Sequence, residues 1–200
     1  MKKIILIFML GLLFVNCSKK DNINEGNLLS QSQRIDVSNA GLVILNSYYE
    51  LLFERLNLLD NNQFISESER IKAVYCLQYL AIGLSQADES SLSLNKVLCG
   101  IDTQDSIGNS VVISDQDKAL MDMLLESAIS SWTSIGSSSS IDGFRGNWLV
   151  REGILTETED HWELTVERLA YDILLSQSPF AFSVIKLPWM EKPLYVTWSF

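Results

Sequence analysis

Apolar residues in the first two thirds of the chain recur every three or four positions, a spacing that places them on one face of a helix. The longest such stripe begins at Leu42 and ends at Leu59. A second helix is predicted to begin at a capping box formed by Ser66 and Glu69 and to end at Gly83. Further helical segments are predicted over residues 92–99, 114–136 and 143–151.

The last third of the chain changes to a period of two. Trp162, Leu164 and Val166 alternate with polar residues, as in a strand with one solvated face. Residues 154–157 are expected to pair with this strand through the polar turn at 158–160. The alternation returns over residues 180–184 and 194–200, and a short helix is favoured over 171–175. These patterns predict one α+β domain over residues 35–200, a helical layer of about five helices followed by a small, mostly antiparallel sheet.

The N-terminal segment resembles a bacterial lipoprotein signal sequence. Two lysines precede an apolar run over residues 4–15, which is shorter than the roughly 20 residues that span a membrane. We expect residues 1–16 to be a signal peptide, Cys17 to be acylated, and residues 17–34 to form a flexible tether. Asn16 stands where such signals carry a small residue, so an uncleaved hydrophobic leader is the alternative. Acylation would place the chain at the bacterial cell envelope.

The charge of the chain argues against nucleic acid and anionic lipid as partners. Its 200 residues include 25 acidic and 15 basic ones, for a formal net charge of −10. Loss of residues 1–16 would remove Lys2 and Lys3 and leave 13 basic against 25 acidic residues, a net charge of −12. No basic surplus is left to neutralise phosphates, so membrane attachment would depend on lipid chains at Cys17.

The residues suited to catalysis or metal binding match no recognised motif. A zinc site built only from His and Cys of one chain would need the one histidine and all three cysteines, and Cys17 is expected to be acylated. His161 beside Asp160 could serve as the general base of an unrecognised hydrolase, but an exposed turn histidine is favoured. Acidic clusters at 102–105, 115–117 and 157–160 lack the spacing of a calcium loop. We therefore expect no enzyme, no cofactor, no metal site and no small-molecule substrate.

Two other sets of residues allow more than one interpretation. Cys76 and Cys99 lie in apolar helical segments; a disulfide or a reactive thiol is conceivable, but buried free thiols are favoured. Near the C-terminus, the residue types are those enriched at the centres of protein interfaces. The alternative is that the tryptophans fill the core between sheet and helices. The candidate interaction residues are Lys186, Trp189, Met190 and Trp198.

Several short strings, in order along the chain, resemble the C-terminal region of contractile injection system tape measure proteins, which belong to phage-tail-like machines. The most specific are LNKVLCG at residues 94–100 and IKLPWM at residues 185–190. Others are NAGLV at 39–43, LFERL at 52–56, LQYL at 77–80, REG at 151–153 and YDILL at 171–175. The resemblance covers residues 35–198. The chain departs from the family with NS at 46–47, where Pro-Phe is common, and with SPF at 178–180, where Leu-Pro-Trp is common.

This resemblance implies a structural protein whose partners are protein components of an injection system. A ruler must span the tube it measures, and 200 residues as one helix would reach only about 300 Å. We therefore expect a terminal assembly or docking module that is lipid-anchored. The alternatives are an envelope lipoprotein that binds a protein or ligand independently of any injection machine, and a cytoplasmic location with assembling particles.

Overall fold

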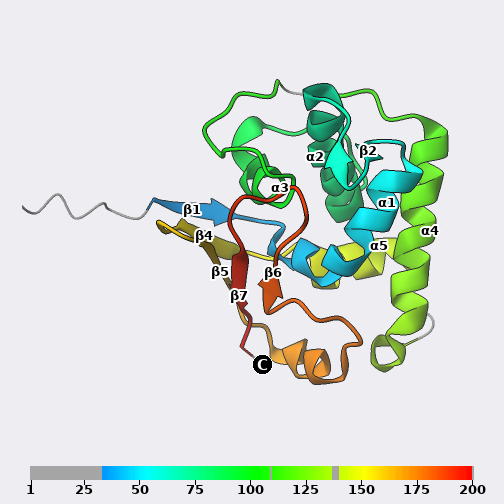
Figure 1. Ribbon diagram of the computed structural model, residues 1–200. Coiled ribbons are helices and arrows are strands. Elements are labelled where there is room, and N and C mark those ends of the chain that lie inside the picture. The colour runs from blue at the N-terminus through cyan, green and yellow to red at the C-terminus, as the bar shows by residue number, and fades with distance from the viewer. Residues whose placement is uncertain (1–32, 109, 137–139, 200) are drawn as a thin grey trace, which may run out of the picture. The chain divides into compact units, whose positions relative to one another are not determined.

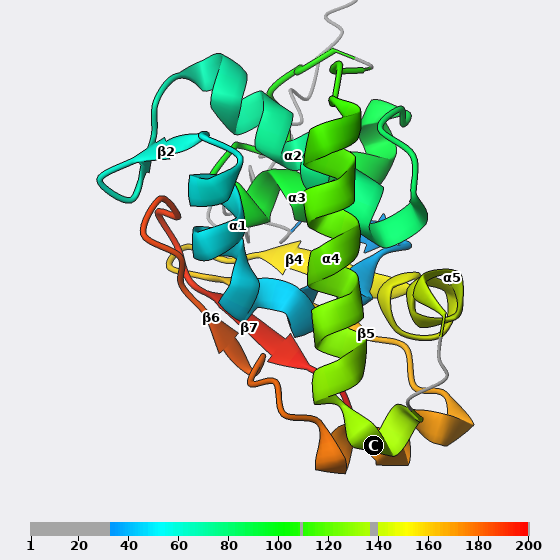
Figure 2. The ribbon, with the colours of Figure 1, turned by 90° about the vertical axis from the view of Figure 1, so that its right-hand side faces the viewer.

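The computed structural model describes residues 33–108, 110–136 and 140–199. The predicted signal peptide, Cys17 and nearly all of the predicted tether lie outside this part. Among the described residues, α1, α2 and α4 gather on one side of a mixed sheet (Figure 1). Figure 2 looks onto α4, with the strands behind it. The predicted α+β class is confirmed.

The five-stranded sheet includes one strand that the sequence pattern did not predict. Strand β1 (Arg34–Val37) precedes the helices and pairs antiparallel with β4 (Gly153–Glu157), so that Ile35 lies opposite Leu155. A strand this short is too brief for a clear alternation, and its partner is far away in sequence. The sheet therefore does not simply follow the helical layer along the chain.

The other strands follow the predicted pattern more closely. Strands β4 and β5 (Trp162–Val166) form the predicted antiparallel hairpin. Strand β7 (Leu194–Thr197) runs parallel to β5, and β6 (Val184–Ile185) pairs antiparallel with β7 at the edge. The order is β1-β4-β5-β7-β6. The sheet is mostly antiparallel, as predicted, but only the end of the alternating segment at 180–184 is a strand.

Helices with local capping signals begin where they were predicted. Helix α2 (Glu67–Ile82) begins after Ser66, whose hydroxyl accepts a hydrogen bond from the Ser68 amide at 3.2 Å. It ends at Gly83, which has a φ of +76° and adopts the left-handed conformation that glycine tolerates. Helix α4 (Asp115–Ser131) begins after Ser114 as predicted, but it ends at Ser131 and not at Gly136, because the backbone leaves the helical conformation at Trp132 before a separate 3₁₀ turn.

The first predicted helix is instead divided. Residues Ala40–Tyr48 form a 3₁₀-helix, α1 follows over Tyr49–Arg55, and Leu59 belongs to a two-residue strand. The backbone at Gly41 packs directly on the backbone of Trp148, where a Cβ atom would clash with the carbonyl group. Tertiary packing thus determines this segment, and apolar spacing alone did not reveal it.

The remaining elements are short. The segments expected to be helical at 92–99 and 143–151 contain α-helices of only six and four residues, each flanked by a turn of a different helical type. These elements are α3 (Ser93–Leu98), α5 (Ile141–Phe144), a π-helical turn (Arg145–Leu149), β2 (Leu59–Asp60), β3 (Gln63–Phe64), and 3₁₀ turns over Glu89–Leu92, Thr133–Ile135 and Ala170–Gln177.

One apolar core joins the helices to the sheet. Phe53, Tyr75 and Trp132 from the helical side are fully buried, as is Leu194 from the sheet. Burying a large apolar side chain contributes about 1.5–3 kcal/mol, so this core dominates the stability. Among the described residues, no helix has the length and apolar character needed to cross a membrane.

Candidate docking site

The segments 94–100 and 185–190, whose strings are the most specific ones in the family resemblance, lie against each other. We call this contact the junction. The indole Nε1 of Trp189 donates a hydrogen bond to the carbonyl oxygen of Leu98, at 2.8 Å. Gly100 ends α3 with a φ of +70°, and a Cβ atom there would clash with the backbone carbonyl of Trp189. A glycine is therefore required twice over, for its backbone conformation and for the close approach.

The ring of Trp189 is buried between the helical layer and the C-terminal segment. Its centroid lies 5.5 Å from that of Phe53 and 5.0 Å from that of Phe64. Trp189 is 7% exposed and Met190 5% exposed. Lys186 is exposed, and its ammonium donates hydrogen bonds to the carbonyl oxygens of Met190 and Glu191. Trp189 and Met190 thus pack inside the chain, and Lys186 closes the loop around them.

Trp198, the last of the candidate interaction residues, is also buried. Its indole Nε1 donates to Oδ2 of Asp172 at 3.0 Å, and the other carboxylate oxygen pairs with the guanidinium of Arg151. The Arg151 guanidinium carbon lies 4.8 Å from the ring centroid of Tyr171 and 5.3 Å from that of Trp198. The buried charge is therefore paired and surrounded by aromatic faces, which offsets part of its desolvation.

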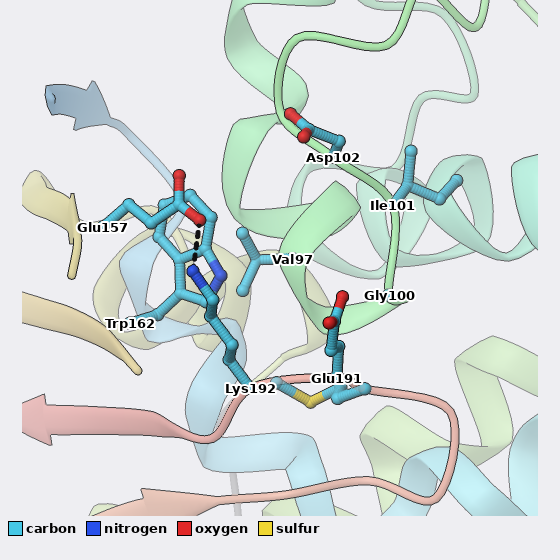
Figure 3. A pocket seen from close by; sticks show the side chains of 9 residues that line it. Val97, Gly100, Ile101, Asp102, Glu157, Trp162, Glu191 and Lys192 are labelled. Atoms are coloured by element: carbon cyan, nitrogen blue, oxygen red, sulfur yellow. Dashed lines mark hydrogen bonds and ion pairs between the residues drawn. The ribbon is translucent and has the colours of Figure 1, made fainter. Parts of the chain in front are cut away.

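A small pocket opens beside the junction (Figure 3). Val97 and Gly100 line it from the first string, and Lys192 lines it just after the second. The Lys192 ammonium donates to Oε1 of Glu157 at 2.8 Å, and this bond raises the pKa of the lysine. The pocket holds about 110 Å³, whereas small-molecule sites usually hold roughly 300–1,000 Å³. Its size suits one inserted side chain better than a substrate or cofactor.

Comparison with known proteins decides the family. A family model described as "contractile injection system tape measure protein" matches residues 17–198. The chain belongs to this family. Searches of curated proteins and of solved structures gave no match.

Two polar residues of the segment 94–100 make buried hydrogen bonds and ion pairs within the fold, a role that sequence analysis missed. The Asn95 side chain accepts from Asn39 at 2.8 Å and donates to the Val74 carbonyl at 3.1 Å. The buried Lys96 ammonium pairs with Glu89 at 3.0 Å and donates to the backbone carbonyl of Asp105 at 2.7 Å. Polar residues inside an otherwise apolar string were the available signal, since buried polar groups need partners.

His161 directly follows the predicted turn between β4 and β5 and lies between two carboxylates. Its Nδ1 lies 2.6 Å from Asp160 and its Nε2 lies 3.1 Å from Glu163. Hydrogen bonding to the carboxylate of Asp160, and then to that of Glu163, raises the pKa of the histidine. Because both ring nitrogens face carboxylates, neither is left free in this geometry to take a proton from a substrate. This geometry gives no support to the hydrolase hypothesis.

Both cysteines of the described part are buried free thiols, as predicted. Burial raises the pKa of Cys76 to about 12 and that of Cys99 well above its ordinary value. Within the acidic cluster at 115–117, Asp117 pairs with Lys72 at 2.8 Å. Among the described residues, no group of three or more His, Cys, Asp or Glu side chains is placed to hold a metal ion.

Proposed function

We propose that this family member is a non-enzymatic docking module of a contractile injection system, held at the cell envelope by lipid chains on Cys17. Membership of the family implies association with components of such a system. The docking role and the anchor go beyond what membership implies. Each is supported by a separate set of residues.

The junction is the observation that carries the docking role. Its backbone and indole contacts hold the 94–100 and 185–190 segments in one arrangement. A surface held in this way loses little conformational entropy when it binds a partner. The adjoining pocket of about 110 Å³ has the size for one side chain of a partner protein. Asp102, Glu157 and Glu191 outnumber Lys192 among its lining residues, so a basic side chain is the favoured occupant.

The anchor rests on the sequence of the N-terminal segment. An apolar run over residues 4–15 is separated from Cys17 by one residue, and residues 18–33 are mostly polar. The chain without residues 1–16 carries a net charge of −12, which opposes binding to anionic lipid. Stable attachment would therefore depend on acyl chains, of which more than one is needed.

The anchor is tested by the mass of the N-terminal peptide from native cells. An acylated Cys17 at the new N-terminus is expected, together with recovery of the chain in the membrane fraction. Cys17→Ser should release the chain, whereas Ser18→Ala, which alters the adjacent residue, should leave it bound. An intact, unmodified Met1 leader would overturn the anchor and direct attention to particles assembling in the cytoplasm.

The docking role is tested by purifying injection particles from cells that carry a charge reversal at the pocket. Asp102→Lys is expected to lower the amount of the chain that co-purifies with the particles. Glu167→Lys is the matched control, because it makes the same charge change just beyond the other end of β5. Absence of the unaltered chain from particles would overturn the docking role and favour an envelope lipoprotein acting independently of the machine.

A further inference from the structure

An apolar groove lies between α1 and α4, which run beside each other in both views (Figures 1 and 2). It has a volume of about 360 Å³. Leu51 is 50% exposed and Met123 is 63% exposed, although both are large apolar residues. The apolar residues that define this groove are Tyr48, Leu51, Leu52, Leu120, Met123 and Leu124.

The residues that line the groove have the spacing of a helix-packing seam. From the α1 side they stand at 48, 51, 52 and 55, and from α4 at 120, 123, 124 and 127. Both sets follow the i, i+3, i+4, i+7 pattern by which one helix contacts another. Two such stripes side by side form the receiving surface for a third helix, which the described part of the chain does not supply.

The groove continues along α4 beyond Arg55. A second hollow of about 450 Å³ shares Arg55, Leu120 and Met123 with the first and reaches Gln116. The stretch of α4 from Gln116 to Ser127 is about 17 Å long at 1.5 Å per residue. That length accommodates about three turns of a partner helix.

The charges around the groove select the occupant. Arg55 is exposed, and its side chain makes no hydrogen bond or ion pair with other described residues. Glu50, Glu54 and Glu126 are exposed along the same two helices, and their carboxylates are also unpaired within the described part of the chain. An occupant with basic flanks and one carboxylate at Arg55 would therefore be complementary. A second copy of this chain would bring the same acidic residues against these.

We propose that this groove binds an amphipathic helix of a partner protein, with an apolar stripe, lysine or arginine on its flanks, and one acidic residue that pairs with Arg55. Helix-in-groove binding of this kind draws its affinity from the apolar anchors and its register from the charges. The inference deepens the proposed function and depends on it in one respect only, namely that the partner protein belongs to an injection system. The apolar and basic character of the partner helix is inferred from the residues that line and surround the groove.

Two synthetic helical peptides test the groove with the full chain in solution. Both carry leucines at i, i+3, i+4 and i+7 and one glutamate; one has lysine flanks and the other glutamate flanks. The lysine-flanked peptide is expected to bind at least about tenfold more tightly. Arg55→Glu and Met123→Glu should each weaken its binding about tenfold or more. Ile173→Glu, at an exposed apolar residue of the 170–177 turn, should leave binding unchanged.

In solution, three outcomes would overturn the inference. These are equal binding of the two peptides, no binding of either at millimolar concentration, or a dimer of the chain that Met123→Glu dissociates in sedimentation. The last would assign the groove to a second copy. Far-ultraviolet circular dichroism of each variant checks that a lost signal is not lost folding.

A photo-crosslinking residue at position 123 in native cells separates this inference from the proposed function. The expected product is an amphipathic segment of an injection-system protein, and position 173 serves as the control. Charge-dependent peptide binding together with a crosslinked segment of the predicted chemistry from an unrelated protein would uphold the groove and contradict the proposed function. A crosslinked segment without that chemistry would overturn the groove.

Discussion

The junction and the groove are made of similar side chains, but the junction buries them and the groove leaves them exposed. Each brings together segments that are far apart in the sequence, and each is made mainly of large apolar residues. At the junction, Trp189 and Met190 are 7% and 5% exposed, whereas Leu51 and Met123 in the groove are 50% and 63% exposed. Residue type therefore does not distinguish a core contact from an open surface. What distinguishes them is how closely the two backbones approach.

A residue without a side chain and a hydrogen-bonding indole explain why the two backbones approach closely at the junction. Gly100 has no side chain, so the backbone of Trp189 lies against it, and the indole reaches the Leu98 carbonyl. Large side chains stand along the groove on both α1 and α4 and leave the space between them open. The contacts of the junction are thus made within this chain, while the described residues leave the apolar surface of the groove exposed, as the proposed partner helix requires.

Thiol reactivity should give the largest difference between the two regions. In a Cys17→Ser background, Cys99 is expected to react with a thiol reagent at least about 1,000-fold more slowly than a cysteine introduced by Met123→Cys. Cys99 is fully buried with a raised pKa, so it reacts only after the structure opens. Quenched samples analysed by mass spectrometry give both rates. Similar rates would mean that Cys99 is as accessible to the reagent as position 123, so that the junction is not closed.

Gly100→Ala should be the most destabilising single change at the junction. The left-handed backbone costs about 1–2 kcal/mol with a side chain, and the clash with the Trp189 carbonyl adds about 1–3 kcal/mol. We expect urea unfolding to show a loss of about 3 kcal/mol. Gly108→Ala is the matched control, since Gly108 has a φ of +82° but no atom near its Cβ position. Equal losses would assign the effect to backbone strain alone.

Trp189→Phe should cost less, about 2 kcal/mol in the free energy of unfolding, because it removes the indole donor to the Leu98 carbonyl. Trp132→Phe controls for the change in size. Trp132 is fully buried, and its Nε1 has no hydrogen-bond partner in the described structure. The difference between the two variants isolates the hydrogen bond, at about 1 kcal/mol. If Trp132→Phe destabilised the chain as much, the bond would contribute nothing.

The part of the fold that sequence predicted is the part encoded locally. Ser66 and Gly83 delimit α2, and the alternation at 162–166 gave β5, because caps and periodicity depend on neighbouring residues. Strand β1 and the 3₁₀-helix at 40–48 depend on pairing with β4 and on contact with Trp148. No local pattern encodes those contacts.

The candidate site shows the same limit. Sequence analysis singled out Trp189, Met190 and Trp198, yet the residue types enriched at interfaces are also those that fill cores. These three side chains are buried within the chain, which fits the interpretation that they fill the core, while their role in binding a partner stays a prediction. Sequence analysis missed the groove. A signal was available, because the consecutive apolar residues Leu51, Leu52 and Phe53 indicate a helix with apolar residues on more than one face.

A titration at the turn between β4 and β5, outside both regions, gives the smallest expected effect. Hydrogen bonds to the carboxylates of Asp160 and Glu163 raise the pKa of His161 in the folded chain above its ordinary value of 6.5. A raised folded-state pKa stabilises the chain fully below pH 6.5, and this contribution is lost as pH rises through the folded-state pKa. His161→Gln should therefore lower stability at pH 5.5 and leave it unchanged at pH 9. Added salt should shrink the difference, because these charges are exposed. Denaturant unfolding at the two pH values measures it; a loss confined to pH 9 would mean that the neutral ring, packed against Tyr195, is the stabilising form.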